Sequence, residues 1–126
     1  MPINSHIDET KKLTVFKATG VLRYDEIIST VKSYYECKPT ENVLWDLTEI
    51  TEIQLTSEQV ETIAGFNLRF EGARRKGKTA LVAPKDEVFG LSRMFGSFSE
   101  IKDIPFQLNI FREFEQAYQW LSEEDS

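Results

Sequence analysis

The chain has 126 residues, of which 40% are hydrophobic and 29% are charged, and its formal net charge is -6. This length and composition suit one domain that buries a core without metal ions or disulfide bonds. The surplus of acids argues against nucleic acid or an anionic membrane as a partner, because both are bound through Lys and Arg. No apolar run approaches the roughly 20 residues of a membrane-spanning helix.

A strand hairpin is expected at the start of the chain, from residues 3–8 and 13–18 around a polar four-residue turn. Gly20 is expected to end the second strand. Apolar side chains then recur at helical spacing over residues 25–37, behind two acids that favour a helix N-terminus. This pattern predicts a first helix that ends before Pro39.

The segment 42–47, Asn-Val-Leu-Trp-Asp-Leu, is too apolar on both faces for a half-exposed strand. Such a segment is typical of an interior strand in a parallel sheet. A loop is expected over residues 48–55. Thr56 then precedes Gln59 by three residues, which is the capping-box arrangement at the start of a helix. This second helix is expected to end around the basic cluster 74–77, where cations and a glycine suit a helix C-terminus.

Residues 79–83 predict another buried strand, and a third helix is expected from Asp86 to about Phe98. From residue 104 to residue 110 apolar and polar side chains alternate, which indicates a strand buried on one face. Pro105 within that strand indicates an edge position, because proline cannot donate a backbone hydrogen bond. Residues 114–121 carry the apolar spacing of a final helix.

The predicted element order is β-β-α-β-α-β-α-β-α, an α/β fold with a mixed five-stranded sheet and helices mainly on one face. The interior strands have apolar residues pointing both ways. The opposite face of the sheet is therefore expected to present an apolar patch that something must cover. A second copy of the chain is the simplest candidate, so a homodimer is expected.

The sequence offers no set of catalytic or metal-binding residues. His6 and Cys37 are the single histidine and the single cysteine, too few for a nucleophile with its base or for a zinc site. Cys37 is expected to be a buried or half-buried helix residue without a role in redox chemistry. Asp46 and Glu49 could form an acid–base pair, but chance proximity among 21 acids explains such a pair. We therefore expect a non-enzymatic protein without a cofactor.

The single cysteine and the lack of a recognisable targeting signal make the cytoplasm the expected compartment. One cysteine cannot form an internal disulfide, and no leader-like segment precedes the first expected strand. The basic segment 72–78 could bind an anion, but it lacks the glycine spacing of a phosphate loop, and helix capping explains it. The segment 89–98 is rich in apolar residues, and Phe89 and Met94 lie off its core stripe. Core packing and an adaptable docking surface both remain open for it.

Motifs spread over nearly the whole chain resemble a known family. They are Trp45-Asp46, Val82-Ala83-Pro84, Phe89-Gly90-Leu91-Ser92-Arg93-Met94-Phe95 and Ala117-Tyr118-Gln119-Trp120-Leu121. Together with the strand order they resemble the STAS family, which has the anti-sigma-factor antagonist fold. The chain is most similar to small, mostly uncharacterised STAS/SEC14-type proteins of bacteria. The resemblance implies the fold and a regulatory or protein-interaction role.

The antagonist branch of this family works as a phosphoswitch, with a serine in an Asp-Ser-Ser/Thr-Gly motif. Here the corresponding residues are Gln54-Leu55-Thr56-Ser57, so the phosphoacceptor position falls on Leu55. Leucine cannot accept phosphate, and the resemblance therefore implies that the switch is lost unless a shift brings Thr56 or Ser57 to the site. The SEC14-type branch implies an apolar small molecule or lipid as ligand, without specifying residues for it.

Two hypotheses follow for the functional site. In the first, a protein partner docks at the carboxyl edge of the sheet, where parallel α/β sheets usually bind ligands. The residues expected there are Asp46, Thr56, Ser57, Pro84, Lys85 and Asp86. In the second, the chain binds an apolar small molecule or lipid through the third helix. The residues expected for that role are Phe89, Arg93, Met94, Phe95 and Phe98.

Overall fold

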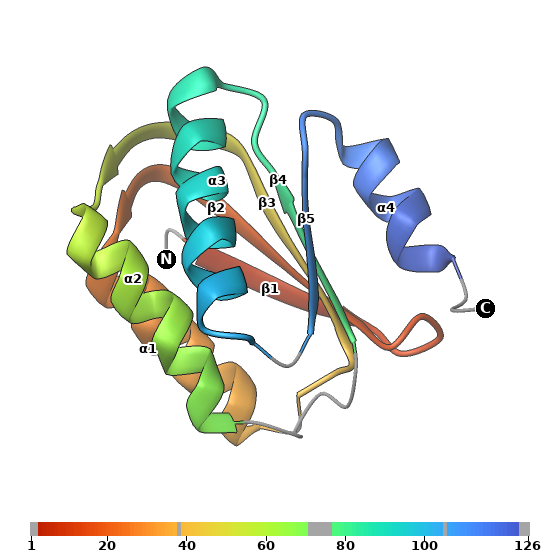
Figure 1. Ribbon diagram of the computed structural model, residues 1–126. Helices are drawn as coiled ribbons and strands as arrows, with labels where there is room; N and C mark the ends of the chain where they lie inside the picture. The colour runs from red at the N-terminus through yellow and green to blue at the C-terminus, as the bar shows by residue number, and fades with distance from the viewer. Residues whose placement is uncertain (1–2, 38, 71–76, 105, 124–126) are drawn as a thin grey trace.

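The computed structural model describes residues 3–37, 39–70, 77–104 and 106–123. Within these residues one sheet has the strand order β1-β2-β3-β4-β5, as Figure 1 shows. The strands are β1 (Ile3–Asp8), β2 (Leu13–Arg23), β3 (Asn42–Gln54), β4 (Lys78–Val82) and β5 (Gln107–Phe111). The helices are α1 (Tyr24–Glu36), α2 (Ser57–Phe66), α3 (Asp86–Ile101) and α4 (Phe114–Ser122), with a 3-10 turn at Asn67–Phe70. β1 is antiparallel to β2 and the other neighbours are parallel, which confirms the predicted α/β order.

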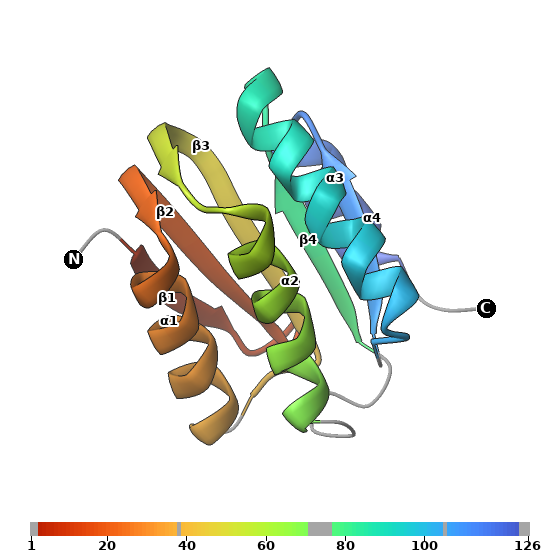
Figure 2. The ribbon, with the colours of Figure 1, turned by 60° about the vertical axis from the view of Figure 1, so that its left-hand side comes forward.

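Helices α1, α2 and α3 cover one face of the sheet, and α4 lies on the other (Figure 2). Each of the first three helices joins two parallel neighbouring strands, and the right-handed rule for such crossovers places all of them on the same side. No strand follows α4 in the described chain, so the rule does not constrain that helix. The prediction that the helices lie mainly on one face of the sheet is therefore confirmed.

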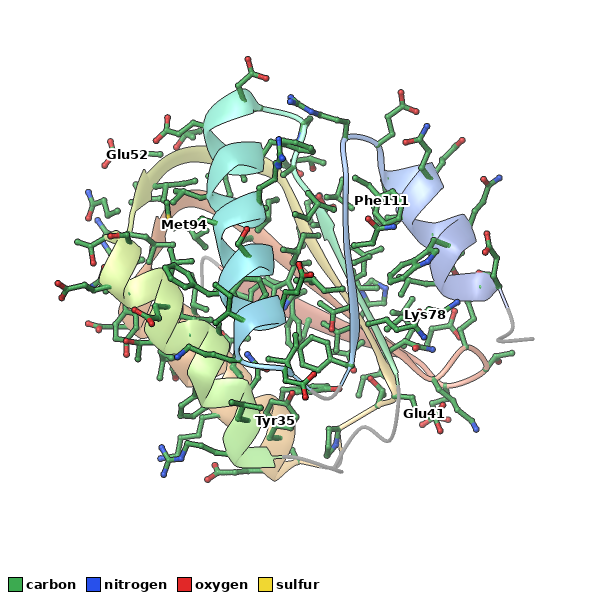
Figure 3. The ribbon with its side chains drawn as sticks, viewed as in Figure 1. Tyr35, Glu41, Glu52, Lys78, Met94 and Phe111 are labelled. Carbon is green, nitrogen blue, oxygen red and sulfur yellow. The ribbon has the colours of Figure 1, made fainter. Side chains whose placement is uncertain are left out.

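The expectation of a bare second face is wrong, because α4 covers it. Ala117 and Leu121 of α4 are buried against apolar residues of the sheet. Those sheet residues are Leu13, Val15, Leu44, Ala80 and Val82. Figure 3 shows Lys78 and Phe111 on this side of the sheet. The Nζ of Lys78 donates hydrogen bonds to the carbonyl oxygens of Trp120 and Glu123 at the end of α4, where a cation complements the helix dipole.

The larger core lies between the sheet and helices α1 to α3. Its buried members are Ala18, Leu22, Ile27, Val31, Tyr35, Leu47, Ile50, Ile63, Ala83 and Val88. All of β4 is buried, which confirms its prediction as an interior strand apolar on both faces. β5 lies at the edge of the sheet, as predicted, and alternates exposed and half-buried residues from Gln107 to Ile110. Pro105 and the basic residues 74–76 lie outside the described part of the chain.

Strands β2 and β3 are longer than the sequence predicted. Gly20 does not end β2 but lies inside it with a φ of 74°, where the register with β3 becomes irregular. β3 continues through the expected loop to Gln54. Gly20 faces Ile50 and Val21 faces Glu52, so Thr51 is an extra residue on β3. This bulge interrupts the alternation of side chains that would mark the segment as a strand.

Candidate functional site

The carboxyl edge of the parallel strands is the place where helices α1 to α4 all begin (Figure 1). Each helix has acids in its first turn, where the dipole favours negative charge. The acids of these first turns are Asp25, Glu26, Glu58, Asp86, Glu87 and Glu115. The described last turns of these helices contain no basic residue. Negative charge is therefore concentrated at this edge.

Cations near the same edge are engaged by neighbouring groups. Lys17 pairs with Glu49, and Arg23 approaches Glu26 at 3.8 Å. The hydrogen bond from Lys17 to Glu49 and the charge of that carboxylate raise the pKa of the exposed Lys17 amine. Several carboxylates at this edge, in contrast, have no cationic partner among the described residues. They are Asp25, Glu58, Glu87, Glu113 and Glu115.

Thr56 and Ser57 lie at the N-terminus of α2, as predicted. The backbone N–H of Gln59 donates to Thr56 Oγ1 at 3.1 Å, and the N–H of Thr56 donates to Gln59 Oε1 at 3.0 Å. These two bonds confirm the capping box. Ser57, the first helical residue, is exposed. Leu55, on which the resemblance placed the phosphoacceptor position, is half-buried and lines an apolar cavity.

Pro84, Lys85 and Asp86 are exposed between β4 and α3 and are tied to both neighbouring strands. Lys85 Nζ donates to the carbonyl oxygen of Ile50 on β3 at 2.7 Å. An Arg112 Nη donates to the Pro84 carbonyl oxygen at 2.9 Å and to Asp86 Oδ1 at 2.7 Å. These bonds join β3, the β4–α3 connection and the end of β5 into one edge.

Arg112 also belongs to this edge, although the sequence patterns did not indicate it. Its guanidinium also lies 4.0 Å from the centre of the Phe89 ring, a cation–π contact. Arg112 follows the edge strand directly, at a position with no helical or strand periodicity to mark it. A cation just beyond the end of a parallel strand, with acids in the helix N-termini nearby, is the signal that could have found it.

Asp46 behaves differently from the other predicted edge residues. It is 9% exposed, and its Oδ1 accepts hydrogen bonds from the N–H and the hydroxyl of Thr48 at 3.0 and 2.6 Å. The carboxylate therefore fixes the path of β3 from inside the edge, where a partner would not touch it. Thr56, Ser57, Pro84, Lys85 and Asp86 remain together on the accessible edge.

An apolar cavity of about 110 Å³ lies between the sheet and helices α1 to α3. Leu22, Ile53 and Leu55 line it near the carboxyl edge. Aromatic side chains line much of the remainder: Phe16, Tyr34, Trp45, Phe95 and Phe106. Thr79 also lines it, and its hydroxyl is buried with no hydrogen-bond partner among the described residues.

The predicted residues of α3 separate into different surroundings. Phe95 faces the cavity, whereas Phe89 and Arg93 line an open groove of about 570 Å³ between α3 and β5. Met94 is half-buried on α3 and lines neither of these two spaces (Figure 3). Phe98 is half-buried and likewise lines neither of them. The segment thus combines core packing with a surface groove.

His6 and Cys37 line neither the cavity nor the groove. His6 is exposed on β1, and Cys37 is exposed just after α1, which contradicts its expected burial. Among the described residues no group of three or more His, Cys, Asp or Glu could hold a metal ion. The described helices include none with the length and hydropathy needed to cross a membrane.

Comparisons with known proteins identify the fold. No family model and no curated protein matches the chain. An uncharacterised protein from the DUF3478 family with a SpoIIAA-like fold, from Shewanella loihica PV-4, is 18% identical, with a TM-score of 0.58 over 94% of this chain and 91% of that chain. The anti-sigma factor antagonist SpoIIAA in its unphosphorylated form is 13% identical, with a TM-score of 0.61 over 98% of this chain and 99% of that chain. The chain therefore has the SpoIIAA-like fold, as the STAS resemblance implied.

Proposed function

We propose that this chain, which has the SpoIIAA-like fold, is a non-enzymatic module that docks a partner protein at the carboxyl edge of its sheet. The observation that supports this most is the organisation of the edge. The capping box of α2, Lys85 and Arg112 hold the exposed residues Ser57, Pro84 and Asp86 in place before any partner arrives. A preorganised surface loses less conformational entropy on binding.

Charge indicates the chemistry of the partner. The unpaired carboxylates at the helix N-termini make a negative surface, and complementary charge guides association and excludes wrong partners. The partner should therefore present a basic surface.

Docking at this edge needs no phosphoacceptor serine. The resemblance places the phosphoacceptor position on Leu55, which cannot accept phosphate, so the proposed module works without that switch unless Thr56 or Ser57 takes the place of the serine. The solved structure of an anti-sigma factor antagonist supports a regulatory role of this kind. The cytoplasm remains the expected compartment for such a regulator.

Matched charge reversals test the proposal. Glu58→Lys with Glu87→Lys changes two exposed first-turn acids at the carboxyl edge. Glu9→Lys with Glu36→Lys changes the net charge equally at exposed positions, in the β1–β2 turn and at the last residue of α1, both at the opposite edge. The edge variant should lose the proteins that co-purify from the host, and the control should retain them. Thermal melts would verify that both variants fold. Equal retention by both variants would contradict docking at this edge.

A second candidate function is binding of a small apolar molecule, and the cavity favours it. Its volume of about 110 Å³ is below the roughly 300–1,000 Å³ of common ligand pockets and near that of an engineered cavity that binds benzene. A single-ring compound fits this volume better than a lipid chain does. The unpaired Thr79 hydroxyl would favour a compound with one polar group.

Titration with phenol and with benzene, followed by protein NMR, tests this second candidate. Both compounds should shift resonances of residues that line the cavity, and phenol should bind more tightly. Thr79→Val should abolish that preference while leaving benzene binding intact. Absence of shifts with either compound, and no extra bound mass in native mass spectrometry of protein from the host, would contradict it.

A homodimer remains a proposal, but an apolar sheet face left bare no longer supports it. α4 covers the sheet face that a second copy was expected to bury. A dimer therefore needs another surface of the molecule.

A further inference from the structure

Strand β5 leaves one side of the sheet open next to a groove. β5 pairs with β4 on one side and is the last strand of the described sheet. The groove between β5 and α3 has a volume of about 570 Å³. Its apolar lining includes Phe89, Ile104, Leu108 and Ile110, and its charged lining consists of Arg93, Glu100 and Asp103.

The backbone of β5 can accept another strand at this edge. Gln107 donates its N–H to the carbonyl oxygen of Gly77, and the carbonyl oxygen of Phe111 accepts from Ala83. Because backbone groups alternate in direction along a strand, those of Leu108 and Ile110 point away from β4. The Ile110 N–H donates to Asn109 Oδ1 at 2.9 Å, so one outward group already has a local partner. Such a cap limits indiscriminate pairing at an edge.

The charges of the groove are arranged so that two copies would complement each other. Gly96 marks the middle of β5, because a methyl group there would lie 3.6 Å from Leu108 and 3.7 Å from Ile110. Arg93 precedes Gly96 by three residues, about 4.5 Å along the helix axis, and Glu100 follows it by four residues, about 6 Å. Both side chains are exposed, and neither has an ion pair among the described residues.

We propose that a second copy of this chain pairs its β5 antiparallel with β5, so that two sheets become one continuous sheet. A two-fold axis between the two β5 strands, at the level of their middle, would bring Arg93 of each copy to the level of Glu100 of the other. The contact is then isologous, as in most homodimers, and closes after two copies. Gly96 and Ser97, small residues of α3 that line the groove, leave room for the two α3 helices to approach at roughly 8–10 Å.

This dimer goes beyond the proposed function and is independent of it. The groove lies along the side of the sheet, whereas the docking surface lies at the carboxyl ends of the strands. Both copies would keep their carboxyl edges accessible, so the dimer would present two docking surfaces. An extended segment of another protein is the competing occupant of the groove, but it would not require that Arg93 and Glu100 match each other across a two-fold axis.

Light scattering on the purified chain tests the proposal. The mass should rise with concentration from 14.6 kDa toward twice that value. Arg93→Glu alone and Glu100→Arg alone should each raise the dimer dissociation constant roughly tenfold to a hundredfold, because like charges would face each other. The double variant, Arg93→Glu with Glu100→Arg, should restore dimerisation. Lys32→Glu, at an exposed position on α1, is the control and should dimerise as the unmodified chain does.

Hydrogen exchange gives a second readout that does not depend on the variants folding. The Leu108 amide points to the open edge and should exchange more slowly as the dimer forms, in step with the measured mass. A chain that stays monomeric at millimolar concentration would overturn the proposal. So would a dimer in which the single charge reversals have no effect, or one in which the Leu108 amide exchanges as it does in the monomer.

Discussion

Thr56 is the residue whose local role can be tested most directly. Its hydroxyl accepts the Gln59 N–H, and Thr56→Ala should lower the free energy of unfolding by about 0.5–2 kcal/mol through loss of the cap. Thr56→Ser should retain most of the stability. Chemical denaturation measures both values. Thr62→Ala, which changes an exposed threonine inside α2, is the control, and an equal loss there would mean that the cap contributes nothing specific.

Tyr118 makes stability depend on alkaline pH. Burial, and then the nearby charge of Asp8, raise the pKa of the Tyr118 hydroxyl above its ordinary value of 10.0. The unfolded chain therefore releases this proton first as the pH rises. The contribution of Tyr118 is complete below about pH 10 and is lost as the pH increases through its pKa in the folded protein. Tyr118→Phe should flatten this alkaline decline in denaturation midpoints, and an unchanged slope would contradict the assignment.

Single residues also show where sequence patterns were informative. Thr56 and Gln59 were predictable because a capping box depends on residues three apart. Gly77 was expected to end a helix, a prediction that depends on residues outside the described part of the chain. A Cβ at this position would lie 1.6 Å from the carbonyl oxygen of Glu41, so glycine permits a close approach of two backbones. That approach joins segments far apart in sequence, and no local pattern encodes it.

At the scale of elements, local patterns located β1 and β4 well, whereas β5 begins only at Gln107, although the alternation starts at residue 104, and α2 ends at Phe66, before the basic cluster that was expected to end it. β1 begins and ends where the alternation and the polar turn predicted. β3 was underestimated because its bulge at Thr51 places Ile50 and Ile53 three residues apart, a spacing that does not indicate a strand. The face on which α4 lies was not predictable from connection rules, because no strand follows it within the described chain.

The packing of α4 makes a quantitative prediction. Leu121 is 7% exposed against the second face of the sheet, and Leu121→Ala should destabilise the fold by about 2–5 kcal/mol because it leaves a cavity. The variant should also bind a hydrophobic dye more strongly than the unmodified chain. Gln119→Ala, on the exposed side of α4, should change neither quantity. Equal effects of the two changes in denaturation and dye binding would mean that α4 does not cover this face.

At the scale of the whole molecule, the net charge was predictable but its distribution was not. The excess of acids is visible in the composition, whereas their convergence at one edge follows from the parallel topology, which makes α1 to α4 all begin there. Ser57, Lys85 and Asp86 lie at the carboxyl edge, where the topology predicted from the sequence placed them, and partner docking there stays a prediction. The sequence alone could not show that Asp46 is buried and so lies outside the accessible docking surface. Its carboxylate is held by hydrogen bonds from Thr48, where β3 becomes irregular.

The charge distribution predicts how binding responds to salt. A negative docking edge that meets a basic partner should bind more weakly as ionic strength rises, mainly through slower association. Surface plasmon resonance at increasing salt, once a co-purifying partner is in hand, measures this. An association rate that is independent of salt would contradict electrostatic complementarity at the edge.

The most direct measurement of docking at the carboxyl edge is site-specific photo-crosslinking in the host. A photoreactive amino acid at Ser57 probes the exposed start of α2, and one at Ser33, exposed near the end of α1, probes the opposite edge. The proposed function predicts a defined protein adduct from position 57 that position 33 does not give. Adducts from position 33 alone, or the same adducts from both positions, would contradict it.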